Sequence, residues 1–291
     1  MEPRSNPSSV ERAIAWIDAA NGRLAAQAVS VSEASGRVLA EDVCAAYPIP
    51  SADCAALDGF GVRARETLGA GAYHPIVLAA CLVAAGGALP EGTDAVVPLD
   101  HAEPQQDAGV AMVEAVAAGD NVHRRGAVAG AGAILLTGST RLGPRQLGLL
   151  LCARLTHLLV VRRPRVRIVI AGSVMSGAVE DSDGPMIRVA VERDGGMPET
   201  TGLADAFAAG ADIVLVIGGT GPGAADKSAA ALAASGELAI HGVALRPGET
   251  AGIGRTADGT LAMLLPGAPA ACLWAYEMFA GRAIRRMAGR D

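Results

Sequence analysis

One stretch limits the folds open to this chain more than any other: an apolar run from Ile213 to Ile217, followed by the glycine-rich segment Gly218–Gly223. The run is too short to span a membrane and is typical of a strand buried on both faces of a parallel sheet. Asp226 then opens an alanine-rich pattern typical of a helix. Strand, glycine turn and helix start together favour an anion site, because glycines allow close backbone approach and helix starts present free N–H groups.

The glycine turn is not one of the common nucleotide-binding motifs. It lacks the lysine of a P-loop and the spacing of the dinucleotide fingerprint. An ordinary tight turn between strand and helix is therefore the alternative that this stretch leaves open when it is taken alone.

Composition excludes several classes of partner. The chain has 291 residues, which is enough for two domains, and its 51% hydrophobic but only 3% aromatic content predicts a core of Ala, Val, Leu and Ile. Lys and Arg number 24 against 30 Asp and Glu, a net charge of -6, so a nucleic-acid or anionic-membrane partner has no electrostatic support.

The cysteines and the apolar runs bear on the compartment. The 5 cysteines are scattered and include no C-x-x-C pair, so neither a disulfide framework nor a zinc site is predicted. The N-terminus is polar, and no apolar run approaches the length of a membrane span. We expect a soluble, cytoplasmic protein.

The C-terminal half alternates strand and helix patterns. Strands are expected at 165–171, 212–217, 238–244 and 260–264, with helices at 184–194, 202–209, 226–234 and from 269 to the end. This order predicts a mainly parallel α/β sheet with helices on both faces, a three-layer fold. Ligands bind such sheets outside the carboxyl ends of the strands. Glycines follow three of the expected strands at this edge: Gly172, Gly218–Gly223 and Gly267.

The N-terminal half has shorter elements. Ser8 and Glu11 form a capping box for a helix whose apolar face continues to Leu24, and short strands are expected at 28–31 and 37–43. Short β-like runs between residues 73 and 116 predict a small β-rich subdomain. The expected domains are a helical and linker region at 1–45 and 119–160, the β-rich subdomain at 46–118 and the α/β domain at 161–291.

Two features of this half are candidates for function. Asp58 precedes a glycine in a turn, where an aspartate is either a functional carboxylate or a structural turn residue. Arg124 and Arg125 are either a phosphate clamp or a solvated surface pair.

Eight short motifs follow one another in a recognisable order. They are the segment ending at Asp58-Gly59-Phe60, Leu89–Val97, Asn121–Gly126, Arg163–Val166, Asp181–Asp183, Gly218-Gly219 with Asp226, Arg246–Gly248 and Leu265–Pro269. From about residue 10 to the end, the chain resembles the molybdopterin molybdenumtransferase family, which includes the C-terminal domain of gephyrin. The chain is a shortened and divergent example of the pattern.

The resemblance implies a fold, a cofactor and partners. It implies a dimer that binds molybdopterin or its adenylylated form and, in active members, inserts molybdate with Mg²⁺ as the nucleotide is hydrolysed. Asp58 and Asp226 map onto the catalytic and metal-binding carboxylates. The cofactor-binding positions map onto Gly172, Ser173, Asp181, Ser182, Gly218, Gly219, Thr220, Gly221, Gly223, Lys227, Arg246, Pro247, Gly248, Pro266 and Gly267. A molybdenum-enzyme client or a molybdopterin adenylyltransferase are further partners that it implies.

Several acidic and polar positions of the family pattern are replaced. The departures are at Ala85, Ala127-Val128, 171–175, Ala224 and Ala268. Mg²⁺ is held by carboxylates, whereas a phosphate can be held by backbone amides and glycines. The binding half of the chemistry is thus better preserved than the catalytic half. We therefore expect a non-catalytic molybdopterin carrier or chaperone, with an active transferase as the alternative and a ligand-free dimeric scaffold as the third hypothesis.

Overall fold

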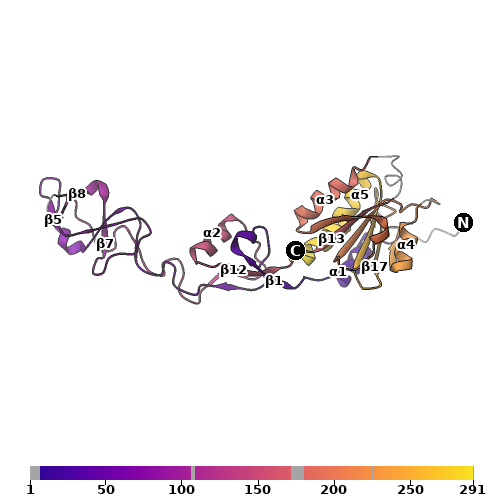
Figure 1. Ribbon diagram of the computed structural model, residues 1–291, viewed down its shortest axis with the longest axis horizontal. Helices are drawn as coiled ribbons and strands as arrows, with labels where there is room; N and C mark the ends of the chain where they lie inside the picture. Colours follow the sequence, from indigo (N-terminus) through magenta and orange to yellow (C-terminus); the bar gives the residue numbers. More distant parts are fainter. Residues whose placement is uncertain (1–6, 106–108, 172–179, 224–225, 291) are drawn as a thin grey trace. The chain divides into compact units, whose positions relative to one another are not determined.

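The computed structural model describes residues 7–105, 109–171, 180–223 and 226–290 (Figure 1). The chain divides into two compact units, each described by itself. The larger unit comprises Met1–Glu41, Gly138–Leu147 and Thr156–Asp291, and the smaller unit comprises Asp42–Thr137 and Gly148–Leu155. Two predicted site residues, Gly172 and Ser173, lie outside the described residues.

The larger unit is built on a six-stranded sheet with the strand order β14-β13-β15-β18-β17-β16. Its strands are β13 (Arg165–Ile170), β14 (Met197–Thr201), β15 (Ile213–Ile217), β16 (Gly236–His241), β17 (Gly252–Thr256) and β18 (Leu261–Leu265). Its helices are α1 (Val10–Ala20), α3 (Asp183–Asp194), α4 (Ser228–Ser235), α5 (Pro269–Ala275) and α6 (Gly281–Met287). Strands β14, β13, β15 and β18 are parallel, whereas β17 and β16 pair antiparallel.

Strand β15 is buried on both faces, as its apolar run predicts. Ile213, Leu215 and Ile217 face a cluster that includes residues of α1, α3, α5 and α6. Val214 and Val216 belong to a second cluster with Leu232 of α4. Helices therefore cover both faces of the sheet, and the expected three-layer α/β fold is confirmed.

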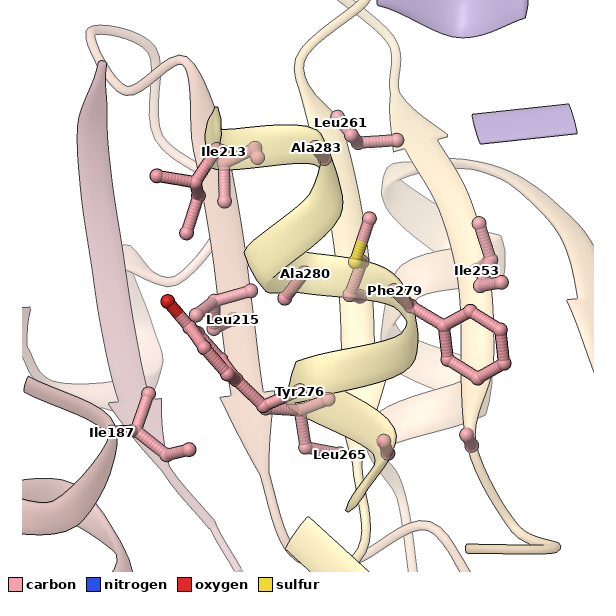
Figure 2. Close-up of a cluster of buried hydrophobic side chains, with 14 of the residues drawn as sticks. Ile187, Ile213, Leu215, Ile253, Leu261, Leu265, Tyr276, Phe279, Ala280 and Ala283 are labelled. Atoms are coloured by element: carbon pink, nitrogen blue, oxygen red, sulfur yellow. The ribbon is translucent and has the colours of Figure 1, made fainter. Parts of the chain in front are cut away.

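The C-terminal helical segment supplies the largest side chains of the core. A π-helical turn over Tyr276–Ala280 joins α5 to α6. Tyr276 and Phe279 are buried against strand residues that include Leu215 and Ile253 (Figure 2). The Tyr276 hydroxyl donates to the buried Asp194 carboxylate at 3.0 Å, so its one polar group is satisfied within the core.

A two-stranded antiparallel sheet lies before the main sheet in the chain. It pairs β1 (Ala26–Ser30) with β12 (His157–Val161). Just after β12, Arg162 donates to both oxygens of Asp212 at 2.8 and 2.7 Å, a bidentate pair that ties this region to the start of β15.

The smaller unit consists of short strands. They are β2 (Val43–Cys44), β3 (Cys54–Ala55), β4 (Gly59–Val62), β5 (Ile76–Leu78), β6 (Cys81–Val83), β7 (Ala95–Pro98), β8 (Ala102–Pro104), β9 (Val110–Met112), β10 (Val122–His123) and β11 (Ile134–Leu136). They form two three-stranded sheets, β6-β4-β7 and β5-β9-β8, and the pairs β3-β10 and β2-β11. Helix α2 (Pro144–Cys152) contains residues of both units. No helix in the described part of the chain is long and apolar enough to cross a membrane.

Three local predictions are wrong. The region 202–209, expected to be a helix, contains a 3-10 turn at Leu203–Asp205 instead, just after strand β14 ends at Thr201. The first helix is capped by Ser9, whose hydroxyl accepts the Arg12 N–H at 3.2 Å, rather than by Ser8, and it ends at Ala20. The strand expected at 37–43 is reduced to isolated bridges at Val38 and Leu39 before β2.

Candidate anion-binding site

Three parallel strands end at the same level of the sheet. Ile170 of β13 is in register with Ile217 of β15, and Ile217 is in register with Leu265 of β18. The hydrogen bonds continue one step past the strands: Ala171 N–H donates to the Ile217 carbonyl at 2.8 Å, and Gly218 N–H donates to the Leu265 carbonyl at 2.9 Å. The turns that follow these strands therefore begin side by side.

Two glycines allow the turn backbones to touch. Gly218 has φ +89°, and a Cβ added there would lie 2.5 Å from the Ala171 carbonyl oxygen. A Cβ on Gly267 would lie 3.2 Å from the Gly218 Cα. This edge is therefore built from backbone, which leaves main-chain groups rather than side chains to meet a ligand.

Ser228 fixes the start of the Gly218–Gly223 turn. Its N–H donates to the Gly219 carbonyl at 3.1 Å, and its buried hydroxyl donates to the Gly218 carbonyl at 2.8 Å. Gly219 has φ +63°, and a Cβ there would lie 2.8 Å from the Ser228 Oγ. The sequence reasoning missed Ser228, although a serine in the first turn of the helix expected at 226–234 was a usable signal.

Two further residues hold Thr220. The His241 Nε2 lies 3.1 Å from the Thr220 carbonyl, so Nε2 carries the proton in this contact. The Thr220 and Thr250 hydroxyls are 2.9 Å apart and form a hydrogen bond. His241 and Thr250 are distant in sequence from the turn, and no local motif pointed to them.

The middle of the turn presents unpaired donors. Within the described residues, no protein acceptor takes the backbone N–H groups of Gly219, Thr220 and Gly221. The carbonyls of Gly218, Gly219 and Thr220 are by contrast all engaged by Ser228 or His241. A turn whose acceptors are satisfied and whose consecutive donors are not is suited to bind an anion.

Asp226 folds back on this turn. Its Oδ2 accepts the Gly223 N–H at 3.1 Å, and its own N–H donates to the Gly223 carbonyl at 2.9 Å. A Cβ on Gly221 would lie 2.7 Å from the same carboxylate oxygen. Asp226 is therefore a brace of the turn. The neighbouring Lys227 is exposed and forms no ion pair within the described part of the chain.

The start of α3 adds carboxylates near the same edge. Asp181 accepts the Gly184 N–H at 2.8 Å, and Ser182 is exposed. Asp183 is 5% exposed, and its Oδ1 has no hydrogen-bond partner among the described residues. Burial, and then the charge of Asp181, raise the pKa of Asp183. Burial, followed by these two carboxylates, also raises the pKa of the Cys272 thiol in α5.

The remaining predicted cofactor residues occupy two turns. Gly248 has φ +127°, and its N–H donates to the Glu249 carboxylate at 3.1 Å. The Arg246 side chain is 91% exposed, and its Nε lies 3.9 Å from Glu249 Oε1. Pro247 is also exposed. Pro266 is buried and Gly267 is exposed at the edge described above.

Asp58 belongs to the smaller unit, whereas Asp226 belongs to the larger one. Asp58 is exposed, and its Oδ1 accepts the Ala85 N–H at 2.7 Å. Arg124 is paired with Asp53 at 2.7 Å, and the same carboxylate accepts the Arg125 N–H, so Arg124 is engaged within the unit. The joint metal-binding role of Asp58 and Asp226 stays a prediction.

Mg²⁺ has a poor fit to the side chains that can be described. No group of three or more His, Cys, Asp or Glu in these parts of the chain is arranged to hold a metal ion. The Gly219–Gly221 donors and the glycine surface around them instead suit a phosphate.

Comparison with known protein families shows which family the chain belongs to. Residues 8–153 match the family described as "MoeA N-terminal region (domain I and II)". The chain belongs to the MoeA family. Residues 133–286 match the "Probable molybdopterin binding domain", a range that contains the glycine turn of this MoeA-family protein. The expected family is confirmed, and with it a place in molybdenum cofactor biosynthesis.

Relatives and solved structures agree with this assignment. The chain is 29% identical to molybdopterin molybdenumtransferase 2 of Mycobacterium tuberculosis over 90% of its own length and 75% of the relative's. It is 26% identical to a Staphylococcus aureus molybdopterin molybdenumtransferase over 98% and 77%. In fold it is similar to the molybdopterin biosynthesis MoeA protein from Pyrococcus horikosii, with a TM-score of 0.75 at 24% identity, over 98% of this chain and 81% of the other.

Proposed function

We propose that this MoeA-family protein binds the phosphate of molybdopterin, or of its adenylylated or metallated form, at the Gly219–Gly221 turn and acts as a non-catalytic carrier. The observation that carries the proposal is the run of consecutive N–H groups at Gly219, Thr220 and Gly221 with no acceptor within the described residues. A phosphate is the part of molybdopterin that such donors recognise.

Hydrogen bonds from later parts of the chain brace the turn. Ser228 holds two of its carbonyls, and His241 and Thr250 hold Thr220. Since the donors are already oriented, binding costs little ordering of the backbone. The exposed Lys227 follows the turn and supplies a positive charge for the same phosphate.

The contacts of Asp226 support carriage rather than catalysis. Its carboxylate is engaged by the Gly223 N–H, and the family's further acidic positions are Ala224, Ala127 and Val128 in this chain. Coupling molybdate insertion to nucleotide hydrolysis requires carboxylates free to organise a hard cation. The proposed role of the turn is therefore to hold the cofactor without hydrolysis. Asp181 and Ser182 at the start of α3, and the turns 246–248 and 266–267, are proposed to contact the rest of the cofactor.

The alternative is an active molybdopterin molybdenumtransferase. It is favoured by the relatives of that name, which match the chain over 90% and 98% of its length. In this alternative Asp58 and Asp226 hold Mg²⁺, and a homodimer brings the two units of different chains together. A ligand-free scaffold is disfavoured, because such a protein has no use for unpaired donors in a glycine turn.

The test is calorimetric titration of the full chain with adenylylated molybdopterin, followed by addition of Mg²⁺ and molybdate while AMP is measured. Saturable binding without AMP release is the result that the carrier proposal predicts. Binding with catalytic AMP release would replace it by the transferase. Absence of binding would overturn both and leave the scaffold.

A further inference from the structure

A cluster of arginines lies at the other end of the parallel strands from the glycine turn. It consists of Arg37, Arg141, Arg163 and Arg290, all of the larger unit, and is called the arginine cluster below. Arg163 precedes the first residue of β13, so the cluster is at the amino ends of the strands. The proposed function uses none of these residues.

Two of the guanidinium groups meet at Gly195. The Arg163 Nε donates to the Gly195 carbonyl at 3.2 Å, and its Nη2 donates to the Gly196 carbonyl at 2.9 Å. A Cβ on Gly195 would lie 2.6 Å from the Arg290 Cζ, which places the second guanidinium directly on the same peptide. The Arg290 Nη2 also reaches the Gly36 carbonyl, at 2.7 Å.

Arg37 and Arg141 complete the cluster from the neighbouring bridge. Arg37 follows Gly36 and donates to the Val161 carbonyl at 3.0 Å, while its buried Nε has no hydrogen-bond partner among the described residues. Arg141 pairs with Val38 in an isolated β-bridge, and its side chain is exposed. Among the described residues, the acceptors that these side chains contact are neutral carbonyls, which leave their positive charge unbalanced there.

The charges act on one another. Burial, and then Arg163, lower the pKa of Arg37. Burial lowers the pKa of Arg290 as well, and Arg141, Arg163 and Arg37 add to this, while Asp194 opposes them. Asp194 is itself engaged by Arg193, Arg285 and Tyr276. Within the described residues, no member of the arginine cluster forms an ion pair with a carboxylate.

Such a cluster is unexpected in a chain whose net charge is -6. Concentrating like charges with an unpaired buried donor destabilises the fold unless an anion is present. Guanidinium groups recognise phosphate oxygens through paired N–H donors. We infer that the arginine cluster is a second anion site, which binds a small phosphate-bearing molecule independently of the glycine turn.

The test is calorimetric titration of the full chain with inorganic pyrophosphate at constant ionic strength. Arg141 is the residue to replace, because it is exposed and donates to no backbone carbonyl in the described contacts. Arg141→Gln is expected to weaken pyrophosphate binding about tenfold, or about 1.4 kcal/mol, and Arg141→Lys to restore part of it. Thermal unfolding in pyrophosphate gives a second readout, since a ligand of the native state raises the Tm.

Two matched controls separate this site from the turn and from net charge. Arg12→Gln removes an exposed arginine of α1 outside the cluster, and Lys227→Gln removes the cation beside the glycine turn. Both are expected to bind pyrophosphate at the cluster as the wild type does. Equal loss in Arg12→Gln, loss in Lys227→Gln alone, or no saturable binding by the wild type would overturn the inference. Loss in Arg141→Gln reports on the cluster and loss in Lys227→Gln reports on the turn, so failure of this inference and failure of the proposed function are distinguishable.

Discussion

The Asp226 carboxylate accepts the backbone N–H of Gly223 at 3.1 Å and closes the glycine turn on itself. Asp226 therefore has a structural role, which requires a hydrogen-bond acceptor but not a negative charge. Among the described residues, the neighbouring Gly219, Thr220 and Gly221 N–H groups have no acceptor. Asp226 thus shapes the site, and its negative charge works against an anionic ligand.

Replacing Asp226 separates these two effects. Asp226→Asn keeps an oxygen that can accept the Gly223 N–H and removes the charge, so molybdopterin affinity is expected to equal or exceed that of the wild type. Asp226→Ala loses the hydrogen bond, about 1 kcal/mol, and is expected to bind several-fold more weakly. Titration calorimetry measures both. If the asparagine variant is as weak as the alanine variant, the charge is required and the brace account is wrong.

Asp183 predicts a dependence of stability on pH. Its pKa is raised in the folded protein, so the native state binds this proton more tightly than the unfolded chain does. The contribution of protonated Asp183 to the free energy of unfolding is complete below the pKa of the unfolded chain, about 4. It is lost as pH rises through the pKa of Asp183 in the folded protein. Asp183→Asn stays neutral at every pH. Urea denaturation should therefore show that the free energy of unfolding of this variant increases relative to that of the wild type as pH rises from about 4 through the folded pKa.

Asp18 is the matched control for that experiment. A hydrogen bond from Arg282 is the largest cause that lowers the Asp18 pKa, although burial opposes it. The pH dependence therefore has the opposite sign. The contribution of ionised Asp18 to the free energy of unfolding is present above the pKa of the unfolded chain and is lost as pH falls through the pKa of Asp18 in the folded protein. Asp18→Asn should lose stability relative to the wild type above pH of about 4. The same sign for both variants would contradict the assignment of Asp183.

Asp58 is expected to contribute to the stability of the smaller unit. Its Oδ1 accepts the Ala85 N–H at 2.7 Å. Asp58→Ala should lower the free energy of unfolding by about 1 kcal/mol, and Asp58→Asn by less, because the amide oxygen still accepts. Chemical denaturation measures this, and molybdopterin affinity should be unchanged in both variants. A large loss of affinity with unchanged stability would instead make Asp58 a ligand-binding residue.

Parts of the fold could be predicted because their sequence signal is local. The apolar run Ile213–Ile217 is a strand with those bounds, and strand β7 (Ala95–Pro98) is one of the short runs expected between residues 73 and 116. Strand β14 was missed because its sequence, Met197–Thr201, is polar and contains a proline, as an edge strand tolerates. Strand β17 was missed because Gly252 and Gly254 hide its pattern while allowing close contact with neighbouring strands.

The site was only partly accessible to sequence reasoning. The glycines and Asp226 stand in one segment, so a turn with anion-binding character could be predicted there. The bracing by His241 and Thr250 depends on strands and turns that come later in the chain. The arginine cluster gathers residues from positions 37 to 290, and only the folded chain brings them together.

The most direct measurement is a titration of molybdopterin into the wild type and two glycine variants. Gly219→Ala puts a Cβ 2.8 Å from the Ser228 Oγ at φ +63°, which distorts the donors at a strain of about 1–2 kcal/mol. Gly202→Ala is the control, since nothing lies within 4 Å of its Cβ. The account predicts at least about tenfold weaker binding by Gly219→Ala, with circular dichroism unchanged, and wild-type affinity for Gly202→Ala. Equal affinity of all three proteins would contradict the turn as the phosphate site.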